Sequence, residues 1–398
     1  MSDVLVLNAG SSTIKYRLLD ESGAAVAGGL VERIGETGSR LVHRSGGDER
    51  VVEERIDDHA AGYRLLFAEL GHPEDQLLAV GHRIVHGGAR FTEATLVDDG
   101  VLAALEELTP LAPLHNPAGI SGIHVAREHY PGVPQVAVFD TAFHHTMPAR
   151  AHRYALPREL ADRYGIRRYG FHGISHAYVA RRAAEHLRRP LTDLAMVSLH
   201  LGNGASAAAV SGGRSVDTSM GLTPLNGLVM GTRAGDADPG VVFHLHREAG
   251  LPAEQIEDLL TRRSGLLGLA GASDLREVHR RADAGDRAAA EALELYCYRI
   301  RCHVGAYAAA LGGLDALVFT AGVGEHDPAV RAEVCRGLAH LGIAVDPHRN
   351  TADESGPRTI SPPDAAVAVL VVPTDEESEV AHEARALVAT RPADRSTA

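Results

Sequence analysis

The sequence has few cysteines, no long apolar run and no recognisable leader. Three cysteines in 398 residues are too few for a disulfide framework, and none is spaced as C-x-x-C. No apolar run approaches the roughly 20 residues that a membrane-spanning helix requires. The opening MSDVLVLNAG lacks a basic region, so we do not expect a signal peptide. These absences predict a soluble, cytoplasmic protein with no membrane partner.

Positive charge is also scarce. The 39 lysine and arginine residues are outnumbered by 52 acidic residues, and the formal net charge of −13 argues against a nucleic-acid partner. Lysine occurs once, as Lys15. A compositional bias towards arginine could leave one lysine by chance. We prefer the interpretation that this position requires a compact ammonium group on a flexible chain, because Lys15 follows a turn rich in glycine and serine.

The pattern that is present is that of an α/β protein. Hydrophobic residues make up 45% of the chain, and its length suffices for two domains with separate cores. A strand at 4–7, a Gly-Ser turn and a second strand at 13–20 open the chain, and Ile14, Tyr16 and Leu18 share one strand face. Because a strand follows the turn, this is a β-meander and not a P-loop.

A second β-meander lies at 194–219. After each copy, helices alternate with short apolar strands, at 78–88 and 135–143 in the first half and at 316–324 and 367–374 in the second. This repetition predicts two similar lobes, each a β-meander followed by alternating α and β segments, with a cleft between them. A single large sheet with insertions is the alternative.

Two prolines within 145–157 mark the expected boundary between the lobes. We predict an N-terminal domain at 1–148 and a nucleotide-binding domain at 149–378. The amphipathic segment 378–390 predicts a helix, and the C-terminal residues 379–398 are expected to pack back on the first domain.

Three glycine-containing strand ends are candidates for binding phosphate, because a tight turn can direct backbone N–H groups and hydroxyls at an anion. Each alone could be purely structural, but three in a two-lobed chain favour a nucleotide site between the lobes. The candidates are Ser11, Ser12, Thr13 and Lys15 in the first turn, Gly202, Asn203 and Gly204 in the second, and Gly322 and Gly324 at a third strand exit.

Other polar residues occupy positions typical of active sites. Asp140 ends an apolar strand, where α/β folds place ligand contacts, although it could be a strand-end cap. His172 precedes a helix and could be a packed core histidine. Arg233 lies in the loop 220–240, which is too apolar for disorder and is expected to be functional. The segment 113–122 is predicted to be a proline-interrupted loop. We do not expect zinc, because H-G-I-S-H lacks the glutamate of H-E-x-x-H.

Over nearly its whole length the chain closely resembles the acetate kinases, of the superfamily of acetate and sugar kinases, Hsp70 and actin. The motifs that carry the resemblance are, in order, NAGSSTIK, GHRIVHGG, HNPAG, FDTAFH, YGFHGISH, HLGNG, MGLTPLNGLVMGTRAGDADPG, TAGVGE and PTDEE. The resemblance implies two ribonuclease H-like lobes and direct, reversible transfer of the γ-phosphoryl group between ATP and acetate, giving acetyl phosphate and ADP. It also implies Mg²⁺, for which Mn²⁺ could substitute, and a homodimer.

The resemblance further implies roles for single residues. The three turns would hold the nucleotide together with His200, and Asn8 and Glu376 would hold the metal. Arg83 and Arg233 would grip acetate and the migrating phosphoryl group, His172 would donate to the transferring oxygens, and Asp140 would orient the arginines or assist the metal. The implied apolar pocket for the methyl group of acetate consists of Val85, Leu114, Phe171 and Pro224.

Three residues depart from the family pattern. Thr13 stands where serine is commoner, so its methyl must fit the turn. His326 replaces a common asparagine beside the adenosine, which could change contacts to the base or ribose. Asp375 replaces an asparagine next to Glu376, and its charge would either attract Mg²⁺ more strongly or repel ATP.

The chemistry of phosphoryl transfer agrees with the residues that the resemblance implies, and several alternative functions stay open. The transition state of phosphoryl transfer carries negative charge on its equatorial oxygens, which arginine, histidine and a metal stabilise. Propionate and butyrate kinases are the nearest alternatives, because one methylene in an apolar pocket is worth only about 1–3 kcal/mol. An ATP-dependent binding protein of the Hsp70 or actin type would need neither Arg83, Arg233 nor His172 at the γ-phosphate. A metal hydrolase built on the histidines is a third, disfavoured alternative.

Overall fold

In a computed structural model, the described residues, 2–113 and 115–390, belong to two compact units. The first unit comprises Met1–Phe143 and Asp375–Ala398, and the second comprises His144–Thr374. The predicted domain limits, after residues 148 and 378, lie a few residues beyond these divisions and stay a prediction. The part of the predicted C-terminal segment from residue 391 onward lies outside the described residues.

The first unit is built on one mixed sheet with strand order β5-β4-β3-β2-β1-β6-β8-β7. Strands β1 to β5 pair in antiparallel fashion, whereas β1, β6 and β8 are parallel neighbours. The elements are β1 (Asp3–Ala9), β2 (Thr13–Leu19), β3 (Ala25–Glu32), β4 (Arg40–Ser45), β5 (Asp48–Glu53), α1 (His59–Leu70), β6 (Leu77–Ile84), β7 (Thr95–Leu96), α2 (Asp99–Glu107), α3 (Asn116–His129), β8 (Gln135–Phe139) and α15 (Glu376–Ala389).

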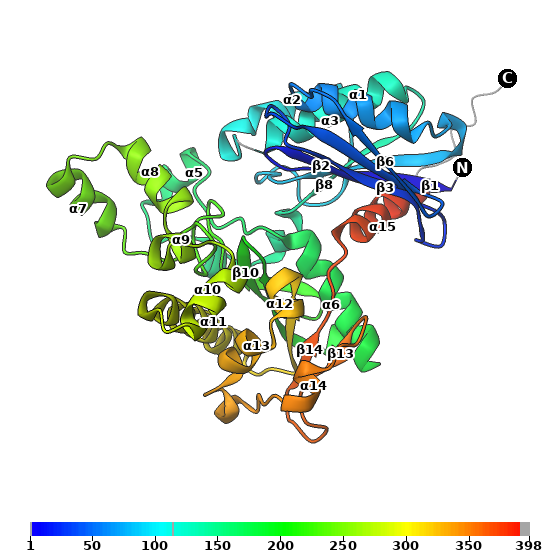
Figure 1. Ribbon diagram of the computed structural model, residues 1–398. Helices are drawn as coiled ribbons and strands as arrows, with labels where there is room; N and C mark the ends of the chain where they lie inside the picture. Colours follow the sequence, from blue (N-terminus) through cyan, green and yellow to red (C-terminus); the bar gives the residue numbers. More distant parts are fainter. Residues whose placement is uncertain (1, 114, 391–398) are drawn as a thin grey trace. The chain divides into compact units, whose positions relative to one another are not determined.

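Helices cover both faces of this sheet (Figure 1). Ile14, Tyr16 and Leu18 of β2 are buried on one face, as predicted, in a core shared with Tyr63 and Phe67 of α1. Figure 1 shows α1 and α3 on one side of the sheet and α15 on the other.

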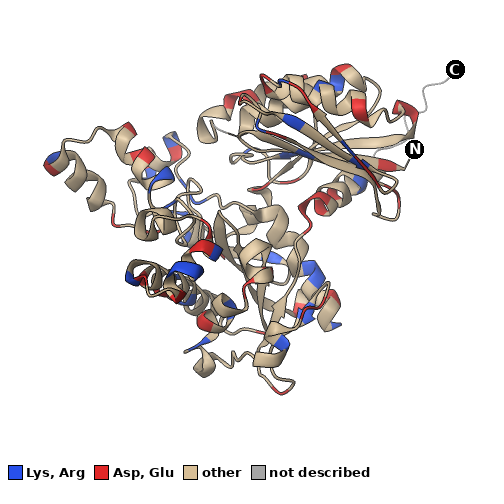
Figure 2. Ribbon diagram, in the orientation of Figure 1, with Lys and Arg blue, Asp and Glu red and all other residues tan. Residues whose placement is uncertain are grey.

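Helix α15 packs against β1 and β6, and glycine permits the close approach. A Cβ atom on Gly81 of β6 would lie 2.8 Å from Cγ1 of Val380. The first turn of α15 is acidic, with Glu376, Glu377 and Glu379 (Figure 2). Negative charge at a helix N-terminus is favoured by the helix dipole.

The second unit contains a sheet with strand order β11-β10-β9-β12-β14-β13. Helix α6 packs on β9 and β12, and the long helix α11 packs on β10 and β9. The elements are α4 (Ala149–His152), α5 (Arg158–Arg163), α6 (Gly173–Leu187), β9 (Ala195–Leu201), β10 (Ala205–Ser211), β11 (Arg214–Thr218), α7 (Gly240–Ala249), α8 (Ala253–Arg262), α9 (Gly265–Ala270), α10 (Leu275–Asp283), α11 (Arg287–Leu311), β12 (Ala316–Thr320), α12 (Ala321–His326), α13 (Pro328–Cys335), α14 (Pro347–Thr351), β13 (Arg358–Thr359) and β14 (Ala368–Val371).

The two sheets share a topology. In each, an antiparallel meander of three strands continues into two parallel strands, in the orders β3-β2-β1-β6-β8 and β11-β10-β9-β12-β14. This confirms the predicted duplicated α/β fold, and the alternative of one large sheet is wrong. The hairpin β4-β5, which the sequence reading did not single out, extends the first sheet beyond the shared part.

Two local predictions were wrong. The segment 113–122 is not a loop throughout, because α3 begins at Asn116 with proline in its first turn, where the missing N–H costs nothing. Gly322 and Gly324 do not form a turn but lie within α12, which begins directly after β12. By contrast, the predicted loop 220–240 contains no helix or strand up to residue 239, and its last residue, Gly240, begins α7. Within the described ranges, no helix is both long enough and apolar enough to cross a membrane.

Candidate functional site

In the first unit, three polar residues lie in one row across neighbouring strands. Asn8 of β1 is paired with Lys15 of β2 in the antiparallel ladder and with Arg83 of β6 in the parallel ladder. Paired residues point to the same face of a sheet, and adjacent strands are about 4.8 Å apart. Because Ile14 faces the α1 core, the row lies on the opposite face, against which α15 packs.

Arg83 is surrounded by acceptors. Its Nε and Nη2 donate to the two carboxylate oxygens of Asp140 at 3.2 and 2.6 Å, and its Nη1 donates to Oδ1 of Asn8 at 3.0 Å. Glu376 Oε2 lies 3.6 Å from Arg83 Nε. Burial opposes the charge of Arg83, but Asp140 and Glu376 outweigh it and raise the pKa of the guanidinium above its usual value. Arg83 is therefore a compensated cation whose orientation Asp140 sets.

Asp140 follows β8 directly, at the strand end where the sequence predicted it. Its backbone N–H donates to the carbonyl oxygen of Ile84 at 3.0 Å, and its side chain is 1% exposed. Burial raises the pKa of Asp140, Arg83 opposes this shift, and Glu376 adds to it. Asp140 and Glu376 therefore both lie against the one guanidinium of Arg83.

The oxygen atoms beside Arg83 fit a magnesium ion. Asn8 offers a carboxamide oxygen and Glu376 and Asp140 offer carboxylates, and Mg²⁺ is usually held by one or two carboxylates together with waters and phosphate oxygens. In residues 2–113 and 115–390, no three His, Cys, Asp or Glu side chains converge as a metal cage.

The first glycine turn joins β1 to β2. The N–H of Gly10 donates to the carbonyl of Thr13 at 2.8 Å, and Nε2 of His59 donates to the carbonyl of Gly10 at 2.9 Å. Ser11 and Ser12 form the bend between the strands. A Cβ on residue 10 would lie 2.7 Å from Oγ1 of Thr13, so the threonine side chain packs over the glycine.

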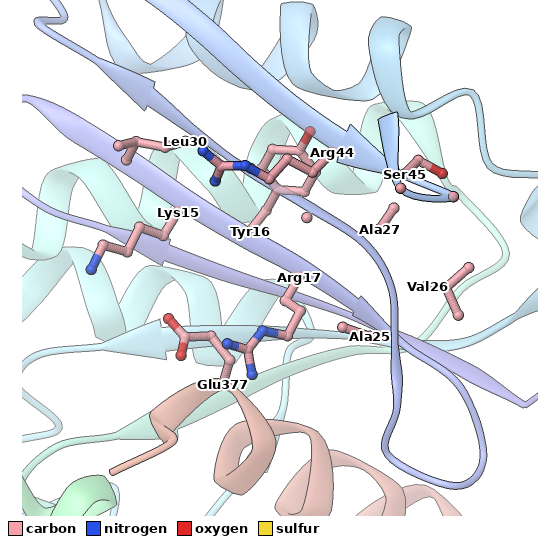
Figure 3. A pocket seen from close by; sticks show the side chains of 14 residues that line it. Lys15, Tyr16, Arg17, Ala25, Val26, Ala27, Leu30, Arg44, Ser45 and Glu377 are labelled. Atoms are coloured by element: carbon pink, nitrogen blue, oxygen red, sulfur yellow. The ribbon is translucent and has the colours of Figure 1, made fainter. Parts of the chain in front are cut away.

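Lys15 lies on β2 and not in the turn itself, and it lines a shallow groove (Figure 3). The groove has a volume of about 490 Å³ and is bordered by β2, β3, the β4–β5 turn and Glu377 of α15. Its two arginines are both paired: Arg17 with Asp375 at 2.8 Å and Arg44 with Glu49 at 2.7 Å.

The pairing with Arg17 changes the interpretation of Asp375. Both oxygens of its carboxylate accept from Nη1 of Arg17 at 2.8 Å. The same carboxylate accepts from the backbone N–H of Ser378 at 3.0 Å and so caps α15. Arg17 therefore compensates the charge of Asp375. The two effects expected from the sequence, on Mg²⁺ and on ATP, did not include this partner.

In the second unit, the turn Gly202–Asn203–Gly204 joins β9 to β10. The N–H of Gly202 donates to the carbonyl of Gly204 at 3.1 Å, and the N–H of Gly231 donates to the carbonyl of Asn203 at 3.0 Å. A Cβ on Gly231 would lie 1.9 Å from Oδ1 of Asn203. The long loop 219–239 therefore docks on the turn at a position that only glycine allows.

Two cationic or hydrogen-donating side chains flank this turn. A Cβ on Gly204 would lie 3.6 Å from Nη1 of Arg233 and 3.6 Å from both Cε1 and Nε2 of His172. Arg233 Nη1 donates to the carbonyl of Pro224 at 3.0 Å, and burial lowers the pKa of Arg233. Across the described part of the chain, Arg233 has no carboxylate partner, unlike Arg83.

His172 has a strained backbone. It is the N-cap residue of α6 with φ of 58° and ψ of 23°, in the left-handed region that non-glycine residues rarely adopt. Such strain costs on the order of 1–3 kcal/mol and clusters at functional sites. The His172 ring stacks on that of His200 with 4.2 Å between centroids, and a Cβ on Gly202 would lie 3.9 Å from Nε2 of His200.

A cavity of about 650 Å³ adjoins the same turn. It is lined by Gly202, Asn203, Gly231, Leu266, Ser273, Asp274, Leu275, Arg276, Tyr296, Gly322, Val323, His326 and Asp327. Of the two glycines predicted in this region, Gly322 lines the cavity. Gly324 instead packs against the backbone of Phe319, 3.3 Å from a Cβ placed on it.

The sequence-predicted residues thus gather in two groups. The first unit brings together Asn8, Arg83, Asp140 and Glu376, with Lys15 in the same row. The second brings together Gly202, Asn203, Gly204, His172, His200 and Arg233, with Gly322 in the adjoining cavity. Of the predicted apolar pocket, Val85 belongs to the first unit, Phe171 and Pro224 belong to the second, and Leu114 lies outside the described residues; the pocket stays a prediction.

Sequence reasoning missed several residues that shape these groups. Ser175 and Ser206 bond the rings of His200 and His172, and Gly231 holds the long loop on the turn. Ser206 had one usable signal: it is the only hydroxyl residue within the otherwise apolar stretch ASAAAV, and a buried serine needs a hydrogen-bond partner.

The chain matches the acetokinase family over residues 3–382. It is 54% identical over 398 residues to an acetate kinase of Leifsonia xyli, covering 98% of this chain and 100% of that protein. It is 55% identical over 393 residues to an acetate kinase of Streptomyces coelicolor, covering 97% of each.

Solved structures are similar over the same length. The structure of an acetate kinase from Porphyromonas gingivalis has a TM-score of 0.92 at 43% identity and covers 98% of this chain and 100% of that one. A propionate kinase from Francisella tularensis has a TM-score of 0.90 at 39% identity, covering 96% and 99%.

Proposed function

The chain belongs to the acetokinase family, and we propose that it is a phosphotransferase that moves the γ-phosphoryl group of ATP to the carboxylate of acetate, giving acetyl phosphate and ADP. This function accounts for the two groups of residues in the two units. We prefer this assignment to the two others considered, an Hsp70- or actin-like binding protein and a metal hydrolase.

The observation that carries the site assignment is the contrast between the two arginines. Arg83 is neutralised by Asp140 and Glu376, whereas Arg233 has no carboxylate partner among the described residues and stands beside a glycine turn and His172. An arginine stays protonated even when partly buried. An anion at this turn would supply the missing countercharge, and the phosphates of ATP have the required chemistry.

In this proposal, the second unit binds the nucleotide. The turn of Gly202, Asn203 and Gly204 takes the phosphates, and the adjoining cavity takes the adenosine. Arg233 and the Nε2–H of His172 stabilise the negative charge that the equatorial oxygens carry during transfer. His326 lines the cavity, so its replacement of the common asparagine acts on contacts to the nucleoside.

The first unit supplies the acceptor side. Arg83, oriented by Asp140, binds the carboxylate of acetate, and Asn8 and Glu376 would hold Mg²⁺. The metal, when bound, neutralises charge on the phosphate oxygens. Acetate is already an anion, so the acceptor oxygen needs no general base, and direct in-line transfer requires only positioning and charge stabilisation.

We also propose a cytoplasmic homodimer. The support is helix α7, which has no buried residue and exposes apolar side chains. Val241 is 39% and Phe243 60% exposed, and an apolar surface of this kind favours a protein partner. Sedimentation equilibrium would measure the mass of the particle, and a monomer at micromolar concentration would refute this part of the proposal.

A hydroxamate assay with ATP and Mg²⁺ tests the function. Acetate should give acyl phosphate at a higher kcat/KM than propionate, and propionate should exceed butyrate. Propionate is included because one of the similar solved structures is a propionate kinase. A preference for propionate would change the substrate, and ATP hydrolysis without any acyl phosphate would refute the kinase assignment.

A further inference from the structure

A buried serine lies between two histidines at the start of α6. Oγ of Ser206 is 2.9 Å from Nδ1 of His172 and 2.8 Å from Nε2 of His176. The other ring nitrogen of His176, Nδ1, is 2.8 Å from Oγ of Ser198. Ser198, Ser206 and His176 are all fully buried, so each polar hydrogen in this chain needs an acceptor.

Because the Ser206 hydroxyl has a single hydrogen, the position of the hydrogen on the His172 ring depends on its position on the His176 ring. If His176 donates from Nε2 to Ser206, the hydroxyl can donate to Nδ1 of His172, and His172 then carries its own hydrogen on Nε2. If the direction is reversed, both rings carry their hydrogen on Nδ1. No third acceptor for the Ser206 hydroxyl occurs in the described parts of the chain, so donation by both rings at once would leave that hydrogen unsatisfied.

The hydrogen bond between His176 and Ser198 decides between these two directions of donation. In the first direction, Ser198 donates to Nδ1 of His176, and the hydrogens of Ser198, His176 and Ser206 all have an acceptor. In the reverse direction, His176 donates to Ser198, and the buried Ser198 hydroxyl has no acceptor among the described residues. Burial, and then the neighbouring His144 and His200, lower the pKa of His176 well below its usual value, so its ring is neutral and has one N–H to place.

We propose that Ser198, His176 and Ser206 form a one-directional hydrogen-bond chain that keeps the hydrogen of His172 on Nε2. This is the atom 3.6 Å from the Cβ position of Gly204, so the chain presents an N–H donor to the phosphate-binding turn. Ser206 and His176 are positioning residues for His172. The inference rests on the proposed function for the role of His172, but the tautomer itself does not depend on catalysis.

Nuclear magnetic resonance of the full-length protein with ¹⁵N-labelled histidine tests the tautomers directly. Two-bond ¹H–¹⁵N spectra at pH 7.5 distinguish Nδ1–H from Nε2–H, and His172→Gln and His176→Gln identify the two signals. We expect both rings to carry hydrogen on Nε2. A hydrogen on Nδ1 of either ring would overturn the proposal. His144, whose Nε2 donates to the carbonyl of Phe171 at 3.1 Å, is an internal Nε2–H reference.

Two matched substitutions test whether the chain matters for transfer. The amide of Gln in His176→Gln can take the place of Nε2 and donate to Ser206, whereas the amide of Asn in His176→Asn takes the place of Nδ1 and reaches only Ser198. We expect kcat of His176→Asn to be at least roughly tenfold below that of His176→Gln, with KM for ATP nearly equal. Equal kcat values would show a merely structural role and refute the positioning.

Different results would refute the kinase assignment and the hydrogen-bond chain. If the hydroxamate assay finds no acyl phosphate but both rings carry hydrogen on Nε2, the kinase assignment fails and the hydrogen-bond chain stands. If the enzyme is an acetate kinase but His172 carries hydrogen on Nδ1, only the chain fails. Should neither His176 variant fold, the spectra of the wild-type protein, with the signal of His172 identified through its own variant, still decide.

Discussion

Arg83 and Asp140 are joined by two hydrogen bonds, from Nε to Oδ1 at 3.2 Å and from Nη2 to Oδ2 at 2.6 Å. The pair links the ends of two parallel strands, β6 and β8, and Asp140 is almost fully buried. A buried ion pair of this geometry orients the guanidinium, and it makes Asp140 costly to replace.

Asp140→Asn should lower both stability and activity. The amide leaves Arg83 without its full countercharge, so we expect the free energy of unfolding to fall by about 3 kcal/mol and kcat to fall by about 10²-fold. Urea denaturation and the hydroxamate assay measure the two effects. Asp99→Asn, at an exposed ion pair with Arg127, is the control and should change neither. An Asp140→Asn enzyme with near-wild-type kcat would limit Asp140 to a structural role.

Arg233→Ala should lower activity without lowering stability. Because Arg233 is half-buried and has no carboxylate partner among the residues that the structure describes, its removal should not lower the melting temperature, whereas kcat/KM for ATP should fall by at least about 10²-fold. Arg233→Lys should recover only part of the activity, because the planar fork is lost. Arg262→Ala, at an exposed pair with Asp258, serves as the control. Full activity in Arg233→Ala would remove this residue from the site.

Lys15→Arg tests the meaning of the single lysine. Lys15 shares a row with Asn8 and Arg83, where a bulkier, planar cation would approach the proposed metal ligand Asn8 differently. We expect kcat to fall roughly tenfold with little change in melting temperature. Arg44→Lys, on the same groove but paired with Glu49, is the matched exchange and should leave kcat unchanged. Full activity of Lys15→Arg would mean that the lone lysine is a product of composition.

Asp375→Asn distinguishes the two effects expected from the sequence. Since Arg17 already compensates this carboxylate, we expect the Mg²⁺ concentration for half-maximal rate and KM for ATP to change less than about twofold. Asparagine can still cap α15, so the loss of stability should stay below about 1 kcal/mol. A large rise in the Mg²⁺ requirement, or a marked fall in KM for ATP, would show that the charge acts on the ligands despite its partner.

Buried histidines predict a loss of stability in acid. Burial lowers the pKa of His82 and of His144 to about 4. As the pH falls from 6.5 towards 4, the unfolded chain binds protons at these positions and the folded chain does not, so the free energy of unfolding decreases. Each histidine should contribute roughly 3 kcal/mol to this decrease by pH 4.

Denaturation curves measured between pH 7.5 and 4.5 give the slope of stability against pH. His82→Gln removes one titrating group while keeping an amide that can donate to Gln135, the present partner of His82. The slope should become shallower in this variant. If it is unchanged, His82 does not stay neutral in the folded protein.

Several features could be predicted because they depend on local pattern. The alternation of Ile14, Tyr16 and Leu18 reveals a strand with one buried face, and the repeated meander reveals the duplicated fold. The failures were also local. Proline at the start of α3 resembles a loop signal although it is tolerated in a first helical turn, and two glycines within six residues resemble a turn although they lie in α12.

The sequence by itself determined the two β-meanders, the duplication and the resemblance to the acetate kinases, because periodicity and motif order are properties of neighbouring residues. Only the tertiary structure decided which charges are compensated. Asp375 meets Arg17 across 358 positions, and Ser206 comes between two histidines of another element. Such contacts depend on how strands and helices pack, and the same packing partly buries Arg233, for which the described residues supply no carboxylate.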